Sequence, residues 1–479
     1  GGSAGRGSAG AGGGPALPSA PMQAVPGDMH RLNAVEYGAT VKDLLGVTAP
    51  TMPNLRGGEL NGFDNNGAVI GMDEGAFSLF YDAARDIAKG TLSDAALRAN
   101  VVTCESQDEA CATSLIQTAG LKLFRRPLVD DERAVYQKLY TKLRAQPLAH
   151  EAALEQVLVA LLSSAQFLYR MEFSSKPEAE PLDPYELASR LSYLLWSSAP
   201  DAPLLEAARL DQVTSDADLE LHLARMWDDA RSARFVESFA GQWLRVRNLT
   251  RHATAPDVYP SWSPQIAWAA GQEVLESFDA LMRDNRDFSE LYVGRPHDID
   301  GLLAPFYGMP AAPAGTRVRL EGERTGFLGS VAFLTLNSLD RRSSPMLRGR
   351  FVLNTLVCEP LPPPRPDIPS LDTDVDLGVL TMRQRYDTIR RNPNCATCHV
   401  LMDPIGLALE HYDGVGQYRA TYADGEPIDS SMTLAPWPGH PEGLPVMGLP
   451  GVVERVTLDP GHRRCAAEQL YNYAIGGMP

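Results

Sequence analysis

The stretch NPNCATCHVLMDPIGLALEHYDGVGQYR, residues 392–419, holds two cysteines and a histidine in the pattern Cys-x-x-Cys-His. A c-type haem is bonded to two thiols that project from one short turn, and the histidine that follows gives its imidazole to the iron. Cys395, Cys398 and His399 meet these requirements. Asp403 followed by Pro404 is the pattern of a helix cap and a first helical residue, so the stretch predicts a new helix after the motif.

A zinc site and a redox-active dithiol are the alternatives for the same residues. Structural zinc needs four ligands, usually with a second Cys-x-x-Cys or a histidine pair, and the sequence offers neither. A thioredoxin-like dithiol belongs to a βαβ setting, whereas the flanking residues predict helix. The pattern therefore favours one covalently bound haem c over both alternatives.

The ligand on the opposite face of the iron is not fixed by the motif. Met346, Met432 and Met447 are the candidates, with His411 a weaker one, and each alone is also explained as a packing or surface residue. An iron without a sixth protein ligand would favour peroxide or oxygen chemistry over electron transfer. Candidate partners for the haem propionates, chosen by closeness in sequence, are Arg390, Arg391, Tyr418, Arg419 and Trp437.

The composition is that of a globular protein, with 44% hydrophobic and 22% charged residues among 479. Lys and Arg number 43 against 60 Asp and Glu, which gives a net charge of −17 and disfavours a nucleic-acid partner. An acidic surface suits solubility or contact with a basic redox protein. No uninterrupted apolar run reaches the length of a membrane span, so none is predicted.

The N-terminal segment differs from the rest of the chain. It begins GGSAGRGSAGAGGGPALPSAP, which cannot form a core and lacks the apolar region of a signal peptide. We expect residues 1–29 to be a flexible tether on a mature, exported protein that is periplasmic or at the cell surface. Such tethers often follow the lipid-bearing cysteine of a bacterial lipoprotein, so an outer-membrane lipid anchor is part of this hypothesis. An artificial linker is the alternative.

Four cysteines lie outside the motif, at Cys104, Cys111, Cys358 and Cys465. An even number allows two disulfides in three connectivities. Cys104 and Cys111 flank a short polar loop and would bridge locally, which would leave Cys358 to pair with Cys465. Disulfides agree with export to an oxidising compartment, and four free buried thiols are the alternative.

Helical periodicity dominates the sequence after the tether, with the clearest amphipathic pattern over residues 150–170. We predict a mainly α, multi-domain protein with a c-type cytochrome-like haem-binding module near the C-terminus. The predicted domains are a tether at 1–29, N-terminal helical modules at 30–173, a central helical module at 183–310, the haem module at 322–440 and a truncated C-terminal helical module at 450–479.

Five stretches resemble, in order, the modules of the planctomycete-type cytochrome c-like proteins, a group of exported bacterial multidomain proteins. RLNAVEYGATVKDLLGV, LKLFRRPLVDDE and LDPYELASRLSYLLWSSAPDAPLLEAA are similar to the first three modules. CATCHVLMDPIGLALEHYDGVGQYR is similar to the haem-bearing module, and CAAEQLYNYAIGG to the start of the terminal one. The resemblance implies export and a c-type haem held by Cys395, Cys398 and His399, but it implies no substrate.

Electron transfer with a redox protein partner is the first functional hypothesis. The second is a haem-dependent oxidoreductase, peroxidase-like or oxidising a small molecule or polymer, because a simple carrier needs only one small domain. The third is a surface-attached binding or assembly protein in which the haem is structural.

Overall fold

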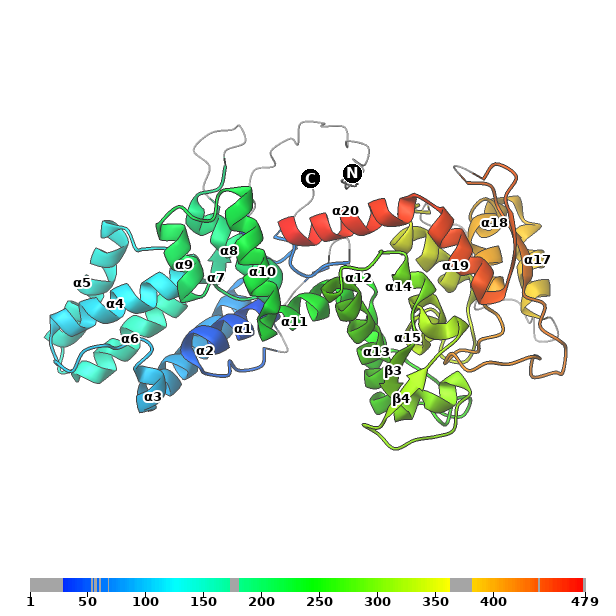
Figure 1. Ribbon diagram of the computed structural model, residues 1–479. Helices are drawn as coiled ribbons and strands as arrows, with labels where there is room; N and C mark the ends of the chain where they lie inside the picture. Colours follow the sequence, from blue (N-terminus) through cyan, green and yellow to red (C-terminus); the bar gives the residue numbers. More distant parts are fainter. Residues whose placement is uncertain are drawn as a thin grey trace, which may run out of the picture.

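The computed structural model describes residues 29–476, apart from 53–54, 56–57, 60–61, 68, 173–180, 362–380 and 438–439. Within these ranges the fold is mainly helical, and the strands form two-stranded antiparallel sheets (Figure 1). The predicted mainly α, multi-domain class is confirmed. The predicted tether up to residue 28 lies outside the described residues.

The N-terminal helices enclose a hydrophobic core of their own. Asn33 caps α1 by accepting the Glu36 N–H, and Gly46 ends it in the left-handed conformation that glycine adopts without strain. The elements are β1 (His30–Arg31), α1 (Ala34–Leu45), α2 (Glu74–Ser93), α3 (Ala95–Arg98), α4 (Glu109–Phe124), α5 (Asp130–Ala145), α6 (His150–Leu162), α7 (Ala165–Leu168) and β2 (Tyr169–Arg170).

The helix predicted over residues 150–170 is in fact shorter. α6 ends at Leu162, and Ser164 then caps α7 by accepting the Phe167 N–H. Tyr169 and Arg170 leave the helix to pair with β1. The first and last elements of the N-terminal body, residues 30–170, are therefore joined. Pairing between distant segments overrides the local helical pattern here.

A second hydrophobic core contains the central and haem-motif segments together. Asp183 caps α8 by accepting the Tyr185 and Glu186 N–H groups, and Pro184 is the first residue of the helix. The helices before residue 300 are α8 (Pro184–Trp196), α9 (Ala202–Arg209), α10 (Asp216–Asp228), η1 (Ala230–Ser232), α11 (Ala233–Phe235), η2 (Val236–Ala240), α12 (Gly241–Trp243), η3 (Val246–Arg251), α13 (Pro264–Arg283) and α14 (Glu290–Val293). The later elements are β3 (His297–Asp300), η4 (Gly301–Tyr307), β4 (Arg317–Leu320), η5 (Glu323–Thr325), η6 (Phe327–Gly329), α15 (Val331–Leu336), α16 (Pro345–Phe351), η7 (Val352–Leu356), α17 (Met382–Arg390), α18 (Pro393–Ala408), β5 (Ser431–Leu434), β6 (Leu444–Met447), α19 (Gly448–Leu458) and α20 (Gly461–Ile475).

The C-terminal helix α20 runs across the top of the molecule, from the haem-motif side toward the N-terminal helices (Figure 1). Near its start, Cys465 is bonded to Cys358. Near its end, the ring of Tyr473 lies 5.4 Å from that of Phe63, and the Tyr473 carbonyl accepts a 2.8 Å hydrogen bond from Asn65. These contacts fasten α20 to segments more than a hundred residues away at both of its ends.

His30 lies buried where α20 meets the N-terminal body. Its Nδ1 is 3.4 Å from the Asn65 carbonyl, and its ring lies against Gly476. Burial, with the nearby charge of Arg170, lowers the pKa of His30 to about 3. The folded protein therefore holds this imidazole neutral, whereas the unfolded chain takes up a proton below about pH 6.5.

The haem-motif helix α18 crosses α16 through two glycines that have no room for a side chain. A Cβ added to Gly406 would lie 1.8 Å from the Pro345 carbonyl oxygen, and one added to Gly349 would lie 1.8 Å from that of Met402. Helix backbones therefore approach each other closely at this crossing, which fixes how α18 lies against the core.

We expect Gly406→Ala to lower the free energy of unfolding by about 1–3 kcal/mol, because the new methyl group overlaps the α16 backbone. Gly38→Ala in α1 is the control, since nothing lies within 4 Å of its added Cβ and the change gains up to about 1 kcal/mol of helix propensity. Denaturant unfolding measures both variants. Equal stabilities for the two would contradict the close crossing.

We expect acid to destabilise the wild type more than His30→Gln, which cannot take up the proton. Between pH 6.5 and pH 5 the difference should reach about 2 kcal/mol, at about 1.4 kcal/mol per pH unit. Denaturant unfolding at pH 7 and pH 5 measures how the free energy of unfolding of each protein depends on pH. The same dependence in the wild type and in His30→Gln would show that the folded protein does not hold His30 neutral.

Candidate haem-binding site

Helix α18 carries the Cys-x-x-Cys-His motif in its first half. Asn392 caps the helix by accepting the Asn394 N–H, and Pro393 is its first residue. The prediction of a new helix beginning at Asp403 is wrong, because α18 continues through Pro404 to Ala408. Pro404 has no N–H for the Val400 carbonyl, yet packing against α16 and α17 keeps the segment helical.

The three motif side chains lie on one side of α18. Cys395, Cys398 and His399 are three and four residues apart, so they occupy neighbouring positions on the helix surface. Cys395 and His399 are buried, Cys398 is half-buried, and both thiols are free. Two thiols and an imidazole therefore stand within one turn, as attachment of a haem c requires.

The other four cysteines form disulfides, Cys104 with Cys111 and Cys358 with Cys465. Of the three connectivities that the sequence allows, the structure has the one with a local bond and a long-range bond. The bonds leave only the motif thiols free in the described part of the chain.

Asp403, which the sequence presents as a helix cap, instead faces the motif histidine. Its two carboxylate oxygens lie 2.9 and 3.0 Å from His399 Nδ1. The Asp403 side chain is fully buried, and burial raises its pKa while the hydrogen bond from His399 opposes that rise. Sequence reasoning missed this role, although the spacing of four residues within one helix was its available signal.

A cavity of about 310 Å³ lies beside α18. Leu401 and Ile405 of α18 line it, and they follow Cys398 at helical spacings of three and seven residues. Trp437 forms another wall, and its buried Nε1 has no hydrogen-bond partner in the described part of the chain. The Arg455 guanidinium lies 3.9 Å from the centre of the Trp437 ring.

The donor set on α18, two free thiols and an imidazole within one helical turn, fits a haem c. Cys395, Cys398 and His399 are not among the residues that line the cavity. Its apolar and aromatic walls include Leu401 and Ile405, which share a face of α18 with Cys398, and the buried indole N–H of Trp437 has no acceptor among the described residues. Trp437 is therefore the predicted propionate partner that the structure places at the cavity. Arg455, which sequence reasoning missed, also forms ion pairs with Asp459 and Glu359.

The structure separates the other predicted propionate partners from this cavity. Arg390 forms an ion pair with Asp387, and Arg419 forms one with the buried Glu410. Tyr418 is 64% exposed and stacks on His411. Arg391 lies at the end of α17 and does not line the cavity.

The sixth-ligand candidates lie in different settings. Met432 is buried on β5, which packs against α18. Met346 is half-buried at the start of α16, and its backbone N–H lies 3.4 Å from the hydroxyl of Tyr386, whose ring faces His399 at 6.1 Å. Met447 is 71% exposed on β6.

Arg348 of α16 holds the far end of α18. It is fully buried and donates hydrogen bonds to the carbonyls of Leu409 and Tyr412 at 2.9 and 2.8 Å. It also donates to the carbonyls of Asp413 and Leu334 and to the Ser338 hydroxyl. Burial lowers the pKa of Arg348 to about 10, so the group remains charged at neutral pH.

A second large cavity, of about 350 Å³, opens beside α13 in the central segment. The nearly buried Glu273 lines it, accepts hydrogen bonds from Tyr307 at 2.6 and 2.7 Å, and lies 3.4 Å from His297 Nε2. Arg324 stacks on Tyr307 and on Tyr412, so this cavity and the haem-motif segment are joined by direct contacts.

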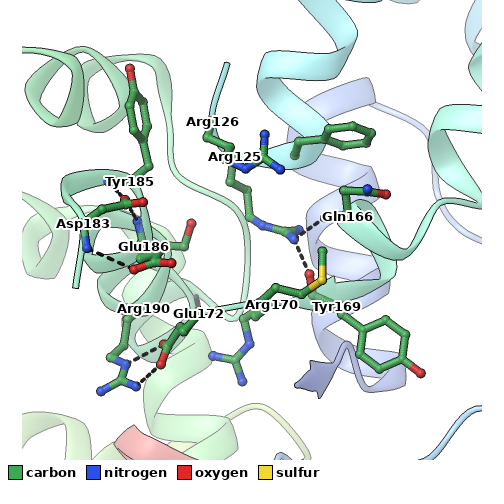
Figure 2. A pocket seen from close by; sticks show the side chains of 13 residues that line it. Arg125, Arg126, Gln166, Tyr169, Arg170, Glu172, Asp183, Tyr185, Glu186 and Arg190 are labelled. Carbon is green, nitrogen blue, oxygen red and sulfur yellow. Dashed lines mark hydrogen bonds and ion pairs between the residues drawn. The ribbon is translucent and has the colours of Figure 1, made fainter. Parts of the chain in front are cut away.

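A third cavity, of about 60 Å³, lies between the N-terminal helices and α8 (Figure 2). Its arginines already have partners within the protein: Arg126 pairs with Glu132, Arg170 with Glu36 and Arg190 with Glu172. Arg125 donates to backbone carbonyls, including those of Gln166 and Tyr169. The pair of Arg190 with Glu172 ties α8 to the end of the N-terminal segment, whereas the other pairs lie within that segment.

The described residues hold neither a side-chain cluster arranged for a metal ion nor a membrane-spanning helix. No group of three or more His, Cys, Asp and Glu side chains is arranged to hold a metal ion there. No helix in the same ranges combines the length and apolar character that crossing a bilayer demands.

We expect Arg348→Lys to lower the free energy of unfolding by about 3 kcal/mol, because one ammonium cannot reach all five acceptors. Arg350→Lys, at an exposed position of the same helix, should change stability by less than about 0.5 kcal/mol. Thermal and denaturant unfolding measure both. A small loss for Arg348→Lys would show that the five hydrogen bonds are not critical.

Four family models match the chain in succession. They are DUF1587 (PSD3) over residues 30–92, DUF1595 (PSD5) over 111–172, DUF1592 (PSD4) over 182–309 and DUF1588 (PSCyt3) over 324–422, each described as a protein of unknown function. No curated protein and no solved structure matches the chain. The PSCyt3 match contains the Cys-x-x-Cys-His helix and its buried Asp403. With all four modules in this order, the chain belongs to the planctomycete-type cytochrome c-like multidomain proteins.

Proposed function

We propose that this protein is an exported mono-haem c-type cytochrome that transfers electrons to and from a redox protein partner. The observation that carries the proposal is the arrangement on α18. Two free thiols and a histidine share one turn, and the histidine is oriented by a buried carboxylate. A cavity lined by Leu401 and Ile405 lies against the same helix. The PSCyt3 match over residues 324–422 supports it.

Each group has a defined part in this proposal. Cys395 and Cys398 would form the thioethers, and His399 would bind the iron through Nε2 while Nδ1 stays hydrogen-bonded to Asp403. Leu401, Ile405 and the other apolar residues that line the cavity would exclude water from one side of the haem. A bound haem supplies one-electron exchange between ferric and ferrous iron.

The disulfides support the exported location in this proposal. Cys104–Cys111 and Cys358–Cys465 are typical of proteins that fold in an oxidising compartment, where c-type haem is also attached. The net charge of −17 suits a partner with a basic docking surface. A lipid anchor beyond the tether remains a prediction.

A haem-dependent oxidoreductase is the second candidate, and the polar cavity at α13 favours it. Glu273 and His297 line a space large enough for a small molecule, and Tyr307 and Arg324 connect that space to Tyr412 of the haem-motif segment. A protein that only transfers electrons does not need a ligand-sized cavity of this kind.

We expect the protein, expressed in a host that assembles c-type cytochromes, to keep one haem per chain after denaturation and acid-acetone extraction. The absorbance of the pyridine adduct measures the amount. The pair Cys395→Ala and Cys398→Ala should abolish retention, because no thioether can form. The control pair Cys104→Ala and Cys111→Ala removes a disulfide elsewhere and should leave the haem content unchanged. An extractable haem, or none at all, would refute the proposal.

Addition of carbon monoxide to the reduced protein separates the two candidates. An unchanged visible spectrum is expected for an electron-transfer haem with six firm ligands. A spectrum that changes on addition shows an accessible iron and favours the oxidoreductase.

A further inference from the structure

We propose that Asp403 is a positioning residue that, through its hydrogen bond to His399, strengthens the histidine as an axial ligand and lowers the reduction potential of the haem. The inference rests on the proposed function and concerns the same site. It assigns a role to a residue that the sequence pattern presents as a helix cap.

The geometry places the carboxylate where it controls the imidazole. Both Asp403 oxygens lie within 3.0 Å of His399 Nδ1, and the two residues are one helical turn apart on α18. A rigid helix therefore sets their separation, and Nδ1 is the donor in the arrangement that leaves Nε2 free for iron. The carboxylate thus selects the tautomer that a haem ligand requires.

The surroundings shield the hydrogen bond between His399 and Asp403 from water. The Asp403 side chain is fully buried and that of His399 is 10% exposed, so water does not compete strongly for either partner. The ring of Tyr386 lies beside the histidine, with 6.1 Å between the two ring centres. The nearest charges on the packed helix α17 are Arg390 and Asp387, which form an ion pair with each other. The His399–Asp403 interaction therefore acts in a setting of low polarity, where it is strong.

The electronic consequence follows from the sign of the charge. A histidine that donates its N–H to a carboxylate becomes a more basic ligand, because the carboxylate draws the proton away from the ring. A more basic axial ligand stabilises ferric iron relative to ferrous iron, which lowers the reduction potential. This effect comes from the histidine side of the iron and is the same whichever group occupies the opposite side.

The decisive experiment compares the reduction potentials of the haem-loaded wild type, Asp403→Asn and Asp387→Asn. Asn has the shape of Asp and still accepts a hydrogen bond but carries no charge, so the potential of Asp403→Asn should rise clearly above that of the wild type. Asp387→Asn removes a neighbouring carboxylate that does not touch His399, and its side chain is 48% exposed, so its potential should stay near the wild-type value. Equal potentials for Asp403→Asn and the wild type, or equal shifts in both variants, would overturn the inference.

A measurement on the wild type covers the case in which Asp403→Asn fails to fold. In ferrous protein with ¹⁵N-labelled histidine, with carbon monoxide added if the iron takes it up, NMR reports the His399 Nδ1 proton. A strongly downfield, slowly exchanging proton is expected from a buried bond to a carboxylate, and a proton that exchanges rapidly with solvent would overturn the inference. Failure of covalent haem attachment is a different result, which would refute the proposed function itself.

Discussion

The buried guanidinium of Arg348 is the constraint around which the haem-motif segment is arranged. A charge without solvent is tolerated only when hydrogen bonds surround it. Arg348 has five acceptors, two in and just after α15 and three in the segment that follows α18. Four of these acceptors are backbone carbonyls, including those of Leu409 and Tyr412. One side chain of α16 therefore holds the segment from Leu409 to Asp413, which directly follows α18.

The close crossing of α16 and α18 complements this interaction. Arg348 fixes the end of α18, and Gly349 and Gly406 bring the two backbones together along its length. With both the end and the middle of the helix held, the first half presents Cys395, Cys398 and His399 from a rigid support. Rigid support matters here, because a hydrogen bond such as that between His399 and Asp403 acts on the ligand only while its geometry is kept.

The sequence predicted a large part of the fold, and the failures share a physical cause. The capped helices α1 and α8 were predictable, because Asn33 and Asp183 act on their own backbones within three residues. The end of α6 was not, because Tyr169 and Arg170 leave the helix to pair with His30 and Arg31, about 140 residues earlier. Pro404 and Asp403 failed as a helix start for a similar reason, since packing against α16 and α17 keeps α18 continuous.

The sequence by itself determined the mainly helical fold and the chemistry of the motif, because helix caps and the Cys-x-x-Cys-His spacing act within one or two turns. It also placed six cysteines so that two thiols stayed available once four had paired. Only the tertiary structure decided which groups surround the motif. Burial turned Asp403 from a presumed cap into the partner of His399, and folding brought Trp437 and Arg455 to one cavity beside Ile405. These contacts depend on how helices tens of residues apart in the sequence pack against one another, and no local sequence pattern specifies that packing.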